Sequence, residues 1–96
     1  MAGSIRMTED EIEAAVATLP GWERADVRIH KVFTFTDFKE AFAFMTRVAV
    51  LAERHQHHPE WFNVYHTVEV WLTTHDARGL TEQDVALARA IDEVAS

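Results

Sequence analysis

The stretch ERHQHHPEWFNVY, residues 53–65, decides the fold because a long helical pattern has to end within it and an extended pattern begins after it. Pro59 cannot continue a helix, and a residue before proline disfavours helical backbone, so the helix must end at or before His58. Four of the six histidines lie in this stretch or ten residues beyond it: His55, His57, His58 and His75. An unperturbed imidazole has a pKa of about 6.5 and exchanges protons near neutrality, so we expect acid/base chemistry on a flat substrate here.

Upstream of this stretch, Asp37 is predicted as the N-cap of the longest helix. The last turns of that helix hold residues 53–57, where the negative end of the helix dipole favours a protonated imidazole. Apolar residues recur at intervals of three and four, and we expect this stripe to face the core: Phe38, Ala41, Phe42, Met45, Val48, Ala49, Leu51 and Ala52. Three further phenylalanines are expected in the core: Phe33, Phe35 and Phe44.

Two shorter amphipathic helices are predicted near the ends of the chain. Thr8 and Glu11 have the spacing of a capping box, and the helix they open ends at Pro20. Thr81 and Asp84 have the same spacing before a last apolar repeat that continues to the C-terminus. The chain therefore has a helical segment at each end and a longer one in the middle.

Extended segments fill the two intervals between these helices. Residues 22–24 form a candidate short strand, and residues 27–35 alternate in the period of two that a half-buried strand requires. Residues 61–65 and 68–73 are predicted to form a hairpin. The order α-β-β-α-β-β-α indicates an α+β two-layer domain, in which helices cover one face of a four-stranded antiparallel sheet.

Length and composition limit the class of protein. With 96 residues the chain has room for a single domain, 1–96, and we expect residues 1–7 to be a loose arm. Its net charge of −7 argues against direct nucleic-acid binding and against an anionic membrane surface. It has no apolar run long enough to span a membrane and no secretory signal, so we expect a cytoplasmic protein. The absence of cysteine excludes disulfides and thiolate chemistry.

The histidine cluster offers enough imidazoles for a zinc site, but we expect no metal. Neighbouring side chains at the end of a helix diverge, and no established zinc spacing such as H-E-x-x-H is present. A purely structural interpretation is also open, in which His57 and His58 only satisfy hydrogen bonds at a helix terminus. From the residue pattern alone, both the acid/base and the structural interpretation of these histidines stand.

A longer pattern extends beyond the cluster. Its members keep a fixed spacing from Glu53 through the triplet 57–59 and on to Tyr65, His75 and Asp84. This pattern resembles the motif of the pterin-4a-carbinolamine dehydratase family, and the similarity covers roughly residues 8–95. Two positions depart from the fuller family pattern, namely Gln56 before the histidine pair and Gln83 before Asp84.

The resemblance implies a hydro-lyase that dehydrates a 4a-hydroxytetrahydropterin to quinonoid dihydropterin, the recycling step that follows an aromatic amino acid hydroxylase. It implies no metal and no organic cofactor, and a homodimer or homotetramer. Vertebrate members also serve as dimerisation cofactors of a hepatocyte homeodomain factor, and some bacterial relatives belong to other pterin pathways such as those linked to molybdopterin. A non-catalytic or differently specific pterin-binding module is therefore the alternative.

The resemblance also implies roles for individual residues. His57 and His75 would act as acid and base, His58 would bind and orient the pterin, and Glu53 would orient an imidazole or stabilise its cation. We expect Glu53 to do this for His57, one turn further along the same helical face. Trp22 would close the pocket over the ring. The remaining expected binding residues are Pro59, Trp61, Thr74 and Asp84.

Overall fold

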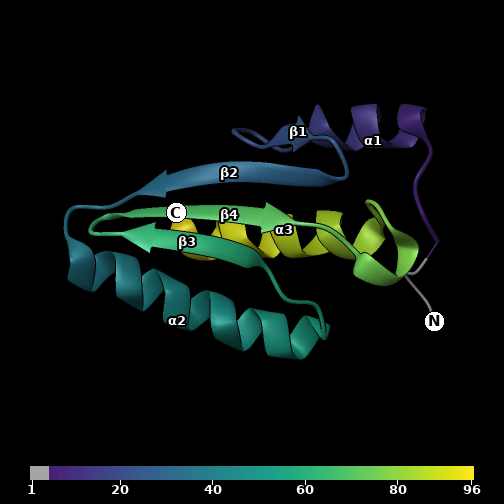
Figure 1. Ribbon diagram of the computed structural model, residues 1–96. Coiled ribbons are helices and arrows are strands. Elements are labelled where there is room, and N and C mark those ends of the chain that lie inside the picture. The colour runs from purple at the N-terminus through teal and green to yellow at the C-terminus, as the bar shows by residue number, and fades with distance from the viewer. Residues whose placement is uncertain (1–4) are drawn as a thin grey trace.

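The computed structural model describes residues 5–96. Its elements are, in chain order, α1 (Glu9–Val16), β1 (Glu23–Ala25), β2 (Arg28–Thr34), α2 (Phe38–His55), β3 (Glu60–Val64), β4 (Thr67–Leu72), the 3-10 helix η1 (His75–Ala77) and α3 (Glu82–Ala95). The expected order is confirmed, with η1 as an addition after the last strand. Figure 1 shows the strands side by side, α2 and α3 running along them, and α1 beside β1. Within residues 5–96, no helix has the length and apolar character needed to cross a membrane.

The strands form one antiparallel sheet in the order β1-β2-β4-β3. In β4, Val68, Val70 and Leu72 are fully buried, whereas the alternate residues Glu69 and Trp71 are only partly buried. Successive side chains of a strand point to opposite faces, so one face of the sheet packs on the helices and the other is open. The predicted α+β fold is confirmed.

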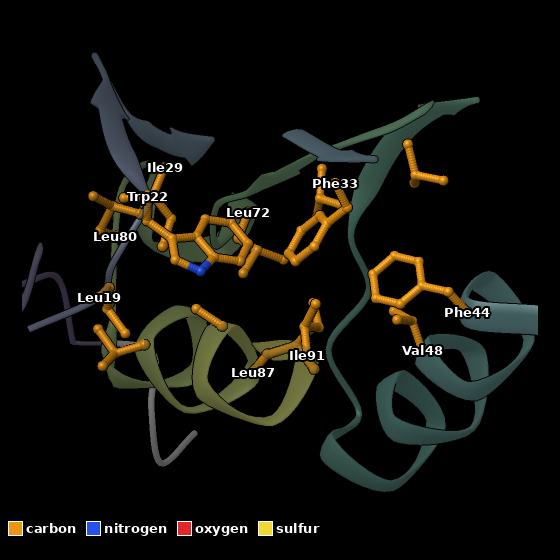
Figure 2. Packing of buried hydrophobic residues seen from close by; sticks show 14 of the residues in the cluster. Leu19, Trp22, Ile29, Phe33, Phe44, Val48, Leu72, Leu80, Leu87 and Ile91 are labelled. Carbon is orange, nitrogen blue, oxygen red and sulfur yellow. The ribbon is translucent and has the colours of Figure 1, made fainter. Parts of the chain in front are cut away.

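The core lies between the inner face of the sheet and two helices. Figure 2 shows Phe33 and Leu72 of the sheet on one side and Leu87 and Ile91 of α3 on the other. Phe33 also packs against Phe44 of α2, with ring centroids 4.9 Å apart. Burying one such side chain contributes about 1.5–3 kcal/mol, so these contacts fix α2 and α3 on the sheet. The ends of these elements are thereby held in place, and the candidate site is built from those ends.

The stripe predicted for α2 is only partly right. The buried residues of this helix are Ala41, Phe44, Val48 and Ala52. Phe38 and Phe42, predicted to lie in the core, are 49% and 56% exposed, and Ala49 is exposed as well. The helix is apolar over a wider arc than the sheet covers, so periodicity alone does not identify the buried edge of the arc.

Helices α1 and α3 both begin with the predicted capping boxes. At α1, the backbone N–H of Glu11 donates to the Thr8 hydroxyl, and the Glu11 carboxylate accepts from the backbone N–H of Thr8 at 2.8 Å. At α3, the Asp84 carboxylate accepts from the backbone N–H of Thr81 at 2.9 Å. This contact ties Asp84 to the first turn of α3.

The arm predicted over residues 1–7 needs a correction. The backbone N–H of Met7 donates to the carbonyl of Leu80 at 2.8 Å, and the Met7 side chain packs against the core. Arg6 reaches the carbonyl of Arg78 at 3.4 Å. Met7 is therefore anchored rather than loose, while the prediction for residues 1–4 lies outside the described residues.

Candidate active site

A cavity of about 390 Å³ opens where the end of α2, the start of β3, η1 and the start of α3 meet. Its volume falls within the range of small-molecule sites, about 300–1,000 Å³. Histidines, amides, hydroxyls and carboxylates dominate its wall, which consists of Gln56, His57, His58, Pro59, Glu60, Thr73, Thr74, His75, Asp76 and Gln83. The cavity therefore suits a small polar ligand that needs proton donors and acceptors.

The end of α2 decides which way the two adjacent histidines point. The helix ends at His55, and Gln56 has left-handed backbone angles, φ 51° and ψ 41°. The backbone N–H of His57 then donates to the carbonyl of Ala52 at 3.1 Å, as in a Schellman motif. The chain turns sharply at this point. In consequence His57 is buried and His58 is exposed.

His57 forms a buried pair with Asp84, its Nε2 lying 2.6 Å from Oδ1. The other carboxylate oxygen, Oδ2, accepts from the Thr74 hydroxyl at 2.8 Å and from the backbone N–H of Thr81 at 2.9 Å. Thr74 and Thr81 also share a hydrogen bond of 2.8 Å between their hydroxyls. The Asp84 side chain is thus both the helix cap and the partner of an imidazole, and the two threonines hold it in place.

His58 lies outside this buried network and has a different carboxylate. Its Nε2 is 2.9 Å from Oε2 of Glu53, and both side chains are largely exposed. The expectation that Glu53 orients His57 is therefore wrong. It assumed that the helix continues to His57, whereas the left-handed Gln56 ends it two residues earlier and brings His58 beside Glu53 instead.

His75 begins η1 on another part of the wall and forms a third pair. Its Nε2 lies 3.1 Å from Oε2 of Glu60, the first residue of β3. Glu60 lies within the 53–65 stretch, but the residue pattern indicates no role for it. Its pairing follows from the tertiary contact between β3 and η1, for which spacing in the sequence carries no signal.

The three imidazoles share one arrangement, in which Nε2 faces a carboxylate oxygen. An ionised carboxylate only accepts hydrogen bonds, so Nε2 carries the proton in the hydrogen-bonded rings of His57 and His58, whereas His75 and Glu60 form an ion pair. Nδ1 of the buried residue His57 makes no hydrogen bond within residues 5–96. Every buried side-chain nitrogen in those residues has a hydrogen-bond partner, so Nδ1 of His57 is not itself a buried atom. This nitrogen is therefore accessible, and in neutral His57 it is a proton acceptor.

The aromatic residues expected around the substrate lie elsewhere. Trp22 does not belong to the wall of the cavity: it is 3% exposed, packs edge-on against Phe33 and donates its indole N–H to Asp92 at 3.1 Å. The expectation that Trp22 closes over the ring is thus corrected, because its apolar ring belongs to the core. Trp61 lines a separate hollow of about 230 Å³ that shares His58 and Pro59 with the main cavity. Pro59 and Thr74 lie on the cavity wall as expected.

The described part of the chain holds no group of three or more His, Asp or Glu side chains arranged to bind a metal ion. In that part each cavity histidine is paired with a carboxylate from a different element: α2 for His58, β3 for His75 and α3 for His57. In this arrangement each carboxylate orients one ring and can support its charge when the ring is protonated.

Residues 5–94 match the family model described as Pterin 4 alpha carbinolamine dehydratase. Relatives named after pterin-4-alpha-carbinolamine dehydratase from Rhodopseudomonas palustris and Nitrobacter hamburgensis are each 56% identical to this chain, covering 95% and 94% of it and 92% and 91% of their own length. The crystal structure of a transcriptional coactivator/pterin dehydratase from Brucella melitensis superimposes with a TM-score of 0.92 at 44% identity, over 95% of this chain and 99% of that one.

Proposed function

Because the chain belongs to the pterin 4 alpha carbinolamine dehydratase family, we propose that it removes water from a 4a-hydroxytetrahydropterin and releases the quinonoid dihydropterin. The observation that carries the proposal is a cavity lined by three imidazoles, His57, His58 and His75, each with one ring nitrogen paired to a carboxylate. A pterin is flat and polar, which suits a cavity with this wall. Further proposals are that the product returns to an aromatic amino acid hydroxylase, that the protein is cytoplasmic, and that no metal or cofactor takes part.

The reaction needs two proton transfers of opposite direction. One imidazole, in its neutral form, accepts a proton from a ring nitrogen of the pterin while the other, in its charged form, donates a proton to the C4a hydroxyl. The C4a–O bond then breaks and water leaves, so the substrate loses one hydroxide and one proton. The two imidazoles finish with exchanged charge states and return to their starting forms by exchange with solvent. His57 and His75 are the residues for these transfers.

The other expected residues then have supporting roles. His58, held by Glu53, binds and orients the pterin at the mouth of the cavity, and Pro59 fixes the backbone that presents the two histidines. Asp84 and Thr74 are positioning residues, because Asp84 contacts His57 and the Thr74 hydroxyl donates to Asp84. Trp61 binds only a part of the substrate that extends into the neighbouring hollow.

A dehydratase assay on freshly generated 4a-hydroxytetrahydropterin tests the proposal. His57→Ala and His75→Ala should each lower kcat by about 10²- to 10⁴-fold, with a residual rate from the reaction in water. The double variant should lose less than the product of the single losses, because the two residues serve one event. His66→Ala, which removes a histidine outside the cavity, is the matched control. Unchanged kcat in both folded single variants would refute the acid/base assignment, and loss of activity with a chelator that zinc restores would reveal a metal site.

The second candidate is a binding or dimerisation module that acts without turnover. The solved structure from Brucella melitensis favours keeping this candidate, because that protein is named a transcriptional coactivator as well as a pterin dehydratase. Such a module would capture its partner equally well with His57→Ala and would show negligible turnover in the wild type. A wild-type protein whose turnover depends on His57 is an enzyme, whatever else it binds.

The proposed assembly is a homodimer or homotetramer. Two exposed apolar surfaces support it, Phe38 and Phe42 on α2, and Phe62 and Val64 on β3, which is an edge strand of the sheet. Exposed edges and apolar patches of this kind are ordinarily covered in solution. Light scattering should give a mass of two or four times 11.0 kDa, and a stable monomer at micromolar concentration would contradict the assembly.

A further inference from the structure

The open face of the sheet carries a row of polar and aromatic side chains that ends at the candidate site. Glu60 of β3 lies opposite Trp71 of β4, and Trp71 lies opposite His30 of β2. Arg28, two residues before His30, points to the same face of the sheet. The row therefore crosses three strands and reaches the cavity at Glu60.

The contacts along this row are continuous. Nη1 of Arg28 donates to Oε1 of Glu60 at 3.0 Å, and the guanidinium lies over the ring of Trp71, 5.4 Å from its centroid. The second oxygen of the same carboxylate, Oε2, faces Nε2 of His75 at 3.1 Å. Each oxygen of Glu60 thus has one partner, Arg28 on the sheet and His75 at the cavity.

The far end of the row is fixed by a separate pair. The ring of His30 stacks on Trp71, with centroids 4.7 Å apart and planes inclined by 30°, and Nε2 of His30 lies 2.9 Å from Oε1 of Glu69. This second pair leaves Glu60 untouched. It therefore provides a matched control, since it lies on the same face and also touches Trp71.

We infer that Arg28 is a positioning residue for the reaction and acts on His75 through Glu60, an inference that rests on the proposed role of His75. The side chain of His75 is 77% exposed, so by itself it has little packing to hold the ring in one orientation. Glu60 supplies the orientation, and Arg28, held over Trp71 on a rigid sheet, keeps Glu60 in place. A site residue on a short helix is thereby supported from strands across the sheet.

The chemical consequence concerns the tautomer of His75. An ionised Glu60 can only accept hydrogen bonds, so its ion pair with His75 at 3.1 Å favours the neutral ring that carries its proton on Nε2 and leaves Nδ1 free for the substrate. Without Arg28, the carboxylate loses its second partner and the ring becomes less well oriented. Without the charge on Glu60, the tautomer itself changes.

Kinetics test whether the three residues act as one unit. Arg28→Met and Glu60→Gln should each lower kcat, Arg28→Met by about two- to fivefold because a partly exposed ion pair contributes modestly. Adding Arg28→Met to Glu60→Gln, or to His75→Ala, should cause no further loss. Glu69→Gln, the matched control, should leave kcat unchanged. Arg28→Lys keeps the charge and should retain part of the activity that Arg28→Met loses.

Nitrogen-15 spectra of the histidine rings test the tautomer directly, at about pH 8.5 where an ordinary imidazole is neutral. Wild-type His75 should show mainly the Nε2–H form. In Glu60→Gln the amide oxygen stays with Arg28 and the NH₂ group turns to His75, so the Nδ1–H form should increase. In the double variant Arg28→Met/Glu60→Gln the amide oxygen is released to face His75, and the Nε2–H form should return.

The outcomes separate this inference from the proposed function. If His75→Ala keeps its kcat, the role of His75 in the reaction is refuted. If His75→Ala loses activity while Arg28→Met and Glu60→Gln keep it, and the His75 tautomer is the same in all variants, only the role of Arg28 is overturned. The role of Arg28 would also be overturned if the loss of kcat in the double variant Arg28→Met/Glu60→Gln equalled the product of the two single losses. Circular dichroism of each variant checks that the comparison is made between folded proteins.

Discussion

His57 and His58 are neighbours in the chain and have the same kind of partner, yet they lie in opposite environments. The side chains of His57 and Asp84 are 10% and 0% exposed, whereas those of His58 and Glu53 are 65% and 78% exposed. The buried pair has a distance of 2.6 Å and a carboxylate with two further donors. The exposed pair has a distance of 2.9 Å, and among residues 5–96 its two side chains make no further hydrogen bond. The left-handed backbone of Gln56 ends α2 just before the two histidines. His57 then lies in a fixed pair and His58 in a loosely held one.

The difference shows how one cavity can hold one imidazole in a fixed position and leave another open to solvent. Breaking a buried charge pair leaves polar groups without partners and without water, at a cost of about 3–5 kcal/mol, whereas an exposed pair contributes about 0–1 kcal/mol. The buried side therefore holds a single geometry, as the proposed proton transfer requires. The exposed side opens at little cost, which suits the proposed role of His58 in binding the substrate.

The largest expected effect is on the buried side of the comparison. Asp84→Ala should lower the free energy of unfolding by about 3–5 kcal/mol, because it leaves His57, the Thr74 hydroxyl and the Thr81 backbone N–H without their acceptor. Urea denaturation measures this change. Glu82→Ala removes an exposed acidic residue from the same helical turn and should change stability by less than about 1 kcal/mol. A similarly small change for Asp84→Ala would show that the buried pair does not stabilise the fold.

A smaller effect is expected on the exposed side, and on binding rather than stability. His58→Ala should raise KM by about tenfold and leave kcat nearly unchanged, because a residue that holds the substrate equally in the ground and transition states affects only KM. Glu53→Gln should change KM in the same direction and by less. Steady-state kinetics measures both. A large fall in kcat for His58→Ala would place His58 among the acid/base residues and erase the contrast with His57.

The smallest effect is expected at the exposed ion pair between Glu9 and Arg24, which is not part of the cavity wall. This pair shows how little an exposed ion pair alone contributes to stability. The hydrogen bond from Arg24 lowers the pKa of Glu9 below its ordinary value of 4.5. A carboxyl group with a lowered pKa stabilises the fold above its unfolded-state pKa, and this contribution is lost as the pH falls through the folded-state pKa. Glu9→Gln should therefore be slightly less stable than the wild type at pH 7, and equal to it in acid. Urea denaturation of both proteins at pH 7 and in acid measures this difference in stability. A difference that persists in acid would show that the lowered pKa of Glu9 is not its cause.

The start of each helix could be predicted from the sequence because capping is local. Thr8, Asp37 and Thr81 are N-caps as expected, since a capping side chain meets backbone N–H groups only two or three residues away. The hairpin of β3 and β4 could be predicted for a similar reason, because strand alternation and turn residues are read within a short window. Observed strand ends differ from the expected ones by a residue or more, as frayed ends do.

The buried edge of α2 could not be predicted from the sequence alone. Phe42 and Phe44 are both large and apolar and stand two residues apart, yet Phe42 is exposed and Phe44 is buried. The sheet covers only one side of the helix, and which side depends on how α2 crosses the strands. A single sequence therefore gives the apolar arc but not the part of it that the fold covers.

The sequence determined the presence of the site, and the tertiary structure decided the partners within it. The motif from Glu53 to Asp84 identified the three histidines and two of their three carboxylate partners by type and spacing, and missed Glu60. The pairing of His57 with Asp84, of His58 with Glu53 and of His75 with Glu60 depends on where α2 ends and on how η1 and α3 pack beside it. The physical reason is range: caps and periodicity act within one or two turns, whereas a hydrogen bond between two elements requires the whole core to bring them within about 3 Å.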